Sequence, residues 1–199
     1  MKAPRPAAAS LLLPLLLATS LTSCSASAGP EPPSRPAASP SSGTAPSLSG
    51  DPTDSAWVQL MIPMDEQAVA LLAMAAKKAA DPRVRSWATR LRTAQDAELA
   101  SLRGLRDRMG LPATDVHAGH NMPGMVTADD LVTAAAAEGG TFDRLLVAQI
   151  RDHLRQSAQV SRSETTAGTR ADARERAGAL VTARERQLAD LDALAGNGG

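Results

Sequence analysis

An internal repeat constrains the fold of this chain more than any other feature. Residues of the segment 91–105 recur at a constant offset of 89 in the segment 180–194: Leu91, Thr93, Ala94, Leu99, Ala100, Leu102 and Leu105 match Leu180, Thr182, Ala183, Leu188, Ala189, Leu191 and Leu194. An apolar segment with helical periodicity precedes each copy, so each half is expected to be a helical hairpin. Two packed hairpins make a four-helix bundle, and the sequence therefore predicts an all-α fold.

Aspartate-proline pairs mark the two helices of the first hairpin. In Asp51-Pro52 and Asp81-Pro82, the aspartate is a typical N-cap and the proline suits the first helical position. We therefore expect helices over residues 52–80 and 82–109. Pro63 lies inside the first of them, where a missing amide predicts a kink.

The second half carries capping boxes and glycine stops. Thr127 with Asp130, and Thr169 with Asp172, have the capping-box spacing. The capping box at Thr127 should start a short helix that Gly139-Gly140 ends, and Thr141 should start the next helix. The predicted helices span residues 127–138, 141–168 and 169–194.

The N-terminus has the pattern of an export signal. Lys2 and Arg5 precede an apolar stretch and a small-residue cleavage site, which predicts a signal peptide over residues 1–23. Cys24 is the only cysteine of the chain and follows Leu-Thr-Ser, which resembles a bacterial lipobox. We expect Cys24 to be diacylated and to anchor the exported protein in a membrane; the alternative is an ordinary signal peptide with a coincidental cysteine.

Composition separates a tether from the folded domain. Residues 24–53 are rich in Pro, Ser and Ala with almost no large apolar side chains, so they are expected to form a disordered linker ahead of a domain over residues 54–195. Without Lys2 and Arg5 the chain is near neutral, and it has no Tyr and only one Phe. Neither property favours a nucleic-acid partner. No protein partner or oligomeric state is predicted.

Polar residues interrupt the apolar face of both hairpins. Asp65 shares a helical line with Met61, Ala68 and Leu72, and His153 takes the matching position in the second half. Gln95 and Glu98 lie on the inward line of the second helix, and at the repeat offset they correspond to Arg184 and Gln187. The sequence therefore predicts one buried layer that contains Asp65, Glu98, His153 and Arg184.

These residues carry a resemblance to a known family. Met61-Ile62-Pro63, Glu66-Gln67-Ala68-Val69, Gln95, Glu98, His117, Met122-Pro123-Gly124-Met125 and Phe142-Asp143 resemble the domain of unknown function 305 family. The resemblance covers about residues 54–194 and implies a ferritin-like, exported bundle that binds copper or another transition metal through His and Met. That pattern has two His-His pairs, and this chain has Met64-Asp65 and Asp152-His153 in their places.

Two groups of residues are candidate metal ligands. The first is the loop with His117, His120, Met122 and Met125, because imidazole and thioether groups suit copper. The alternative is that these histidines are solvated and the methionines cap the core. The second is a layer with Met64, Asp65, Glu98 and His153, but Arg184 beside it favours a hydrogen-bonded ion network instead. Met61, Met64 and Met74 are most simply core residues.

No motif for catalysis is present, so we expect no enzyme. The chain lacks a nucleophile elbow, a glycine-rich phosphate loop and a Glu-x-x-His pair. Two functions stay open. The first is a lipid-anchored bundle that binds copper through the His/Met loop, and the second is a metal-free structural or interaction module that has lost the family's metal site.

Overall fold

The computed structural model describes residues 51–196, so the predicted signal peptide, the acylation of Cys24 and the linker up to residue 50 lie outside the described residues. The described part is built from α-helices without a strand. In chain order the helices are α1 (Pro52–Lys78), α2 (Pro82–Arg108), α3 (Ala128–Ala136), α4 (Gly139–Ala167) and α5 (Ala171–Gly196). The predicted all-α class is confirmed.

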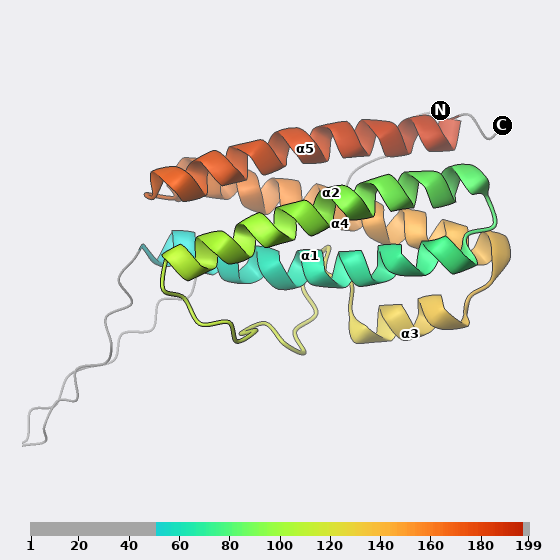
Figure 1. Cartoon of the computed structure of the whole chain (residues 1–199), viewed down its shortest axis with the longest axis horizontal. Helices are drawn as coiled ribbons and strands as arrows, with labels where there is room; N and C mark the ends of the chain where they lie inside the picture. The colour runs from blue at the N-terminus through green and yellow to red at the C-terminus, as the bar shows by residue number, and fades with distance from the viewer. Residues whose placement is uncertain (1–50, 197–199) are drawn as a thin grey trace, which may run out of the picture. The chain divides into compact units, whose positions relative to one another are not determined.

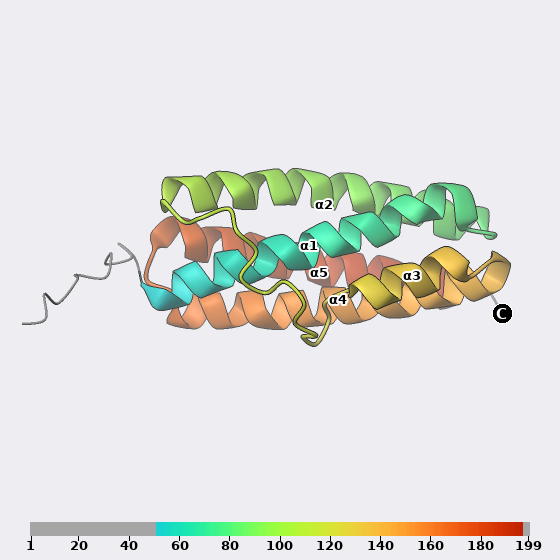
Figure 2. The same cartoon turned by 90° about the horizontal axis from the view of Figure 1, so that it is seen from below.

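Four long helices form a bundle of two hairpins. α1 packs on α2 and α5 packs on α4, while α1 also contacts α4 and α2 contacts α5. The connection between the hairpins crosses the α1 and α4 side of the bundle and contains α3, which runs along both helices (Figures 1 and 2). The four-helix bundle of two hairpins that the repeat predicts is therefore present.

The starts of the first-hairpin helices agree with the sequence. Asp51 accepts a hydrogen bond from Thr53 N at 2.7 Å, and Asp81 accepts one from Arg83 N at 2.7 Å. The following prolines occupy the first helical turn. α1 runs through Pro63 without a break, and α1 and α2 end slightly earlier than predicted.

The junction of α3 and α4 corrects one prediction. The Thr127 and Asp130 capping box is present, but α3 ends at Ala136. Gly139 does not end α3 and instead is the first residue of α4, with Glu138 as N-cap. Its φ of 58° lets the chain reverse at once, and the Glu138 carbonyl accepts from Thr141 N at 3.2 Å.

Each hairpin turn is held by a carboxylate from the other hairpin. Asp143 of α4 accepts from Ala80 N at 3.1 Å and from Asp81 N at 2.8 Å, between α1 and α2. Asp54 of α1, which lies 89 residues before Asp143, does the same in the other turn: it accepts from Thr169 N at 3.0 Å and from Arg170 N at 3.1 Å, between α4 and α5.

The predicted Thr169 and Asp172 capping box is therefore wrong. The Thr169 hydroxyl donates to Asp54 Oδ2 at 3.0 Å, and Asp172 instead pairs with Arg170 at 3.0 Å. The first amides of the turn are satisfied from α1 rather than from within α5, because a buried carboxylate already lies against them.

Two apolar clusters fill the bundle on either side of a polar layer. The first packs the C-terminal half of α1 against the starts of α2 and α4, with Phe142 and Trp87 in it. The second contains Trp57, Met61 and Met64 with the end of α2 and the start of α5. Met61 and Met64 are core residues, as their spacing predicts. α1 is long and apolar enough for a membrane span, yet 56% of that window is buried in the bundle, as in a core helix.

Candidate functional site

A layer of polar side chains crosses the bundle between the two apolar clusters. α1 contributes Asp65, α2 contributes Glu98, α4 contributes His153 and α5 contributes Arg184, and each of these is buried. Helical periodicity pointed each residue inward, and the packing of the hairpins brings the four together as predicted. Gln95 and Ser157 complete the layer.

Arg184 is the centre of this layer. Its Nη1 donates to Glu98 Oε2 at 3.0 Å, and its Nη2 donates to Glu98 Oε1 and to Asp65 Oδ1, the latter at 2.9 Å. Its Nε donates to Ser157 Oγ at 2.7 Å. A guanidinium with paired carboxylates and further acceptors is the arrangement that compensates a buried charge. The predicted ion network is confirmed.

One proton belongs to the acidic pair of the layer. Burial and the charge of Asp65 raise the pKa of Glu98 to about 8, although the Arg184 charge opposes this. Burial also raises the pKa of Asp65, against the lowering effect of Arg184. The nearby Asp65 charge therefore favours the protonated form of Glu98. Arg184 then balances the one remaining negative charge.

His153 is a neutral member of the layer. Its Nε2 lies 3.1 Å from Gln95 Nε2 and 3.4 Å from Asp65 Oδ1, and its Nδ1 has no hydrogen bond. Burial, followed by the charge of Arg184, lowers the pKa of His153 to about 3. The sequence alone left the sign of this shift open. The cation of the layer is therefore Arg184, and its guanidinium occupies the space between the two carboxyls.

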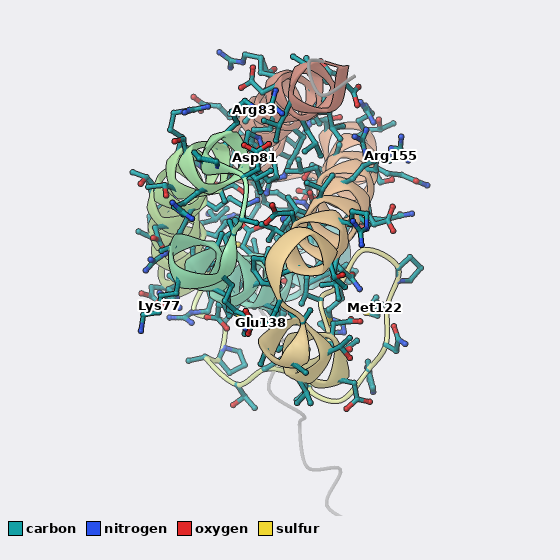
Figure 3. The ribbon with its side chains drawn as sticks, turned by 90° about the vertical axis from the view of Figure 1, so that its right-hand side faces the viewer. Lys77, Asp81, Arg83, Met122, Glu138 and Arg155 are labelled. Carbon is teal, nitrogen blue, oxygen red and sulfur yellow. The ribbon has the colours of Figure 1, made fainter. Side chains whose placement is uncertain are left out.

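The His/Met loop lies outside the four helices, on the side of α1 and α4. Two tight turns shape it, with His120 N donating to His117 O at 2.9 Å and Met125 N donating to Met122 O at 3.0 Å. The imidazole rings of His117 and His120 stand edge to face, with 6.1 Å between their centroids. Figure 3, which views the bundle end-on, shows Met122 on this outer loop.

A pocket of about 420 Å³ lies between this loop, α1 and the start of α3. His117, His120 and Met125 line it, whereas Met122 does not. Its other polar lining was missed by the sequence interpretation: Gln67, Asp115, Asn121, Thr127 and Asp129. The nearness of Asp115 to His117 in sequence was an available signal, and Asp115 Oδ1 accepts from His117 N at 2.8 Å.

The loop packs directly over the polar layer. Gly124 has a φ of 73°, and a Cβ placed there would lie 2.4 Å from Gln156 Cβ and 2.9 Å from the Asp152 carbonyl. These residues flank His153 on α4, and Met125 packs against the second apolar cluster. A glycine is required for this approach. Among residues 51–196, no group of three or more His, Cys, Asp or Glu side chains is arranged to hold a metal ion.

Comparison with known proteins agrees with this geometry. The model of the family described as domain of unknown function (DUF305) matches residues 54–195. This chain is a DUF305 protein. Among curated proteins, none is significantly similar to it in sequence.

Solved structures show the same fold for this DUF305 chain. A DUF305 protein from Streptomyces coelicolor, described as a candidate secreted protein, is 20% identical with a TM-score of 0.64, over 74% of this chain and 94% of that one. A DUF305 fragment from Deinococcus radiodurans is 16% identical with a TM-score of 0.66, over 74% and 98%. CopM in its Cu(II)-bound form is 19% identical with a TM-score of 0.62, over 72% and 96%.

Proposed function

We propose that this DUF305 protein is an exported, lipid-anchored bundle that binds copper through its His/Met loop. The observation that carries the proposal is the pair of adjacent imidazoles, His117 and His120, on the wall of a pocket that also exposes the Met125 side chain. Imidazole with thioether is a donor set that suits copper. The structural neighbour CopM, which is described as Cu(II)-bound, supports the choice of metal.

The polar layer supports placing the copper in the loop and not in the bundle. A cation between Asp65 and Glu98 would have to displace Arg184, which donates to both. The like charge of a buried guanidinium opposes a second cation nearby. The loop has no basic side chain among the residues that line its pocket, other than the two histidines.

Copper titration of the purified protein tests this proposal. Cu(I) and Cu(II) are titrated into the protein and into a variant with alanine at His117, His120, Met122 and Met125, and the affinities are compared. A matched control is Met74→Ala, which removes a partly buried thioether of α1 that packs on the first apolar cluster. We expect the control to bind as the wild type does and the loop variant to lose binding. Equal binding by all three proteins would remove the loop from the mechanism.

A metal-free interaction module is the second candidate function. Its supporting observation is the layer itself, where Arg184 supplies an internal cation at the level of the missing family histidines. If neither copper ion is bound by the wild type, this second function takes precedence. The export part of the proposal draws on the sequence signal ahead of Cys24 and on the secreted description of the Streptomyces coelicolor neighbour.

A further inference from the structure

A second buried acid pair lies away from the polar layer, at the turn between α4 and α5. Asp54 comes from the first turn of α1 and is 0% exposed, and Glu164 comes from the end of α4 and is 1% exposed. Asp54 is on the helical line of Asp65, and Glu164 is on the line of His153, each at a spacing of 11 residues. Both side chains therefore point into the bundle.

Asp54 has the environment of an ionised carboxylate. It accepts hydrogen bonds from Thr169 N, the Thr169 hydroxyl and Arg170 N, at 3.0 to 3.2 Å. Burial acts to raise the pKa of Asp54, but hydrogen bonds from Glu164, Arg170 and Thr169 outweigh it and lower the pKa. An acid that accepts several N–H and O–H bonds keeps its charge.

Glu164 has the environment of a protonated acid. Neither of its oxygens has an N–H or hydroxyl partner, and its neighbour is the Asp54 carboxylate. Burial, followed by the hydrogen bond to Asp54 and the charges of Asp54 and Asp51, raises the pKa of Glu164 to about 8. Two carboxyls can share a hydrogen bond only if one of them carries a proton.

The surroundings of Glu164 offer little to stabilise its charged form. On α5, Arg174 lowers the pKa of Glu164 only weakly, and its Nε donates to the Thr165 carbonyl at 3.2 Å. Arg170 is paired with Asp172 at 3.0 Å. From the loop, His117 lines the same small apolar pocket as Glu164.

Gly168 shows that the carboxyl of Glu164 is fitted into the turn. A Cβ at this position would lie 2.2 Å from Glu164 Oε1. The φ of Gly168 is −66°, which any residue can adopt, so the glycine is required by lack of space: the same Cβ would also lie 2.7 Å from the backbone carbonyl oxygen of Glu164.

The other hairpin supplies a comparison within the same molecule. There Asp143 holds the Ala80 and Asp81 amides in the same way, but the position that matches Glu164 in the repeat is Ala75, which is buried. The second carboxyl is thus a feature of one end of the bundle only. It is the end at which the chain enters the domain at α1.

We propose that Asp54 and Glu164 share one proton, and that this proton holds the α4–α5 turn against the start of α1. Loss of the proton to solvent leaves two buried carboxylates in contact without a cation between them, which is strongly unfavourable. The repulsion is relieved when Glu164 moves out toward solvent, which loosens the turn from α1. This end of the bundle is therefore a pH-sensitive contact, whereas the Asp143 end has, among the described residues, no second buried carboxyl that could share a proton.

The sign of the effect on stability follows from the raised pKa. The folded protein holds the Glu164 proton up to about pH 8, whereas the unfolded chain releases it near the ordinary value of 4.5. The contribution of Glu164 to the free energy of unfolding is therefore largest below pH 4.5. It falls as the pH rises toward 8 and stays constant above 8. Glu164→Gln imitates the protonated acid and removes this dependence.

Amide NMR spectra of the full protein between pH 6 and 10 test the proposal. We expect the Thr169 and Arg170 amides to shift with a midpoint near the pKa of about 8, while Ala80 and Asp81 stay still. Glu164→Gln should lack the transition and should melt at an equal or higher temperature than the wild type at pH 8. The control Glu175→Gln removes an exposed acid of α5 and should keep the transition.

A direct titration of the Glu164 side-chain carboxyl carbon in the wild type keeps the test independent of any variant. A midpoint between 4 and 5 in that titration would overturn the proposal, because the pair would then hold no proton at neutral pH. So would a transition that survives in Glu164→Gln, or one of equal size at the Asp143 end.

Discussion

Replacing Arg184 with leucine tests the central claim about the polar layer. The arginine is 0% exposed and donates to Glu98, Asp65 and Ser157 at the crossing of all four long helices. Leucine leaves the apolar clusters on either side intact but removes the resident cation. The Asp65 carboxylate then remains buried with a negative charge and no counter-ion.

The size of the expected loss follows from the charges in the layer. Removing one partner of a buried ion pair costs about 3–5 kcal/mol, because the other charge is left uncompensated. Glu98, with its pKa of about 8, carries a proton at neutral pH, so Arg184→Leu strands one carboxylate and not two. We therefore expect a loss of about 3 kcal/mol at pH 7, near the lower end of that range.

Urea unfolding followed by circular dichroism measures this loss. At pH 5 the deficit of Arg184→Leu should shrink, because without its cation the Asp65 carboxyl protonates more readily and the buried charge disappears. The matched control is Arg162→Leu, whose exposed pair with Glu185, at 2.9 Å, should contribute no more than about 1 kcal/mol.

Two results would refute the ion network. One is a loss for Arg184→Leu no larger than that of the control. The other is a gain in stability that depends on added metal and disappears with a chelator, which would show that the layer is a cation site blocked by Arg184. Conversely, a variant with apolar residues of similar volume at all four positions, Asp65, Glu98, His153 and Arg184, should have nearly the same free energy of unfolding as the wild type, because no charge is then left without a partner.

Two further predictions concern the loop and the anchor. Gly124→Ala should destabilise the protein by about 1–3 kcal/mol because its Cβ would collide with Gln156, while Gly119→Ala, with a similar φ of 77° but open space around it, should lose less in the same unfolding assay. Cys24→Ala should move the protein from the membrane to the soluble fraction of its host when fractions are probed by immunoblot; unchanged membrane association would argue against acylation.

The inward positions of the polar layer were predictable from the sequence because helical periodicity depends only on local spacing. Asp65 and His153 were found as polar residues on apolar lines, and the repeat related the two lines. Asp54 and Glu164 lie on the same two helical lines, yet the sequence analysis did not predict that they are buried. Asp54 stands beside the Asp51-Pro52 helix start, where an acid is expected on the surface of the first turn, and nothing local shows that it is buried.

For the His/Met loop, the sequence predicted the ligand-type residues but not their arrangement. Its histidines and methionines were recognised by residue type, but the sequence does not tell which of them face one space. The fold turns His117, His120 and Met125 toward a common pocket and leaves Met122 outside it, since the Gly124 turn packs against α4. Asp115 and Asp129 join the lining from the two ends of the connection, and only packing on α1 brings them close.

The helices, their repeat and the inward polar positions are properties of the chain, because each depends on residues within a few turns of one another. The partner of each buried charge is a property of the fold. Asp65 meets Arg184 and Asp54 meets Thr169 across more than 100 residues, and burial then sets which carboxyls keep a proton. Desolvation and long-range contacts have no local pattern in a sequence, so the protonation of this core emerges only when the two hairpins pack.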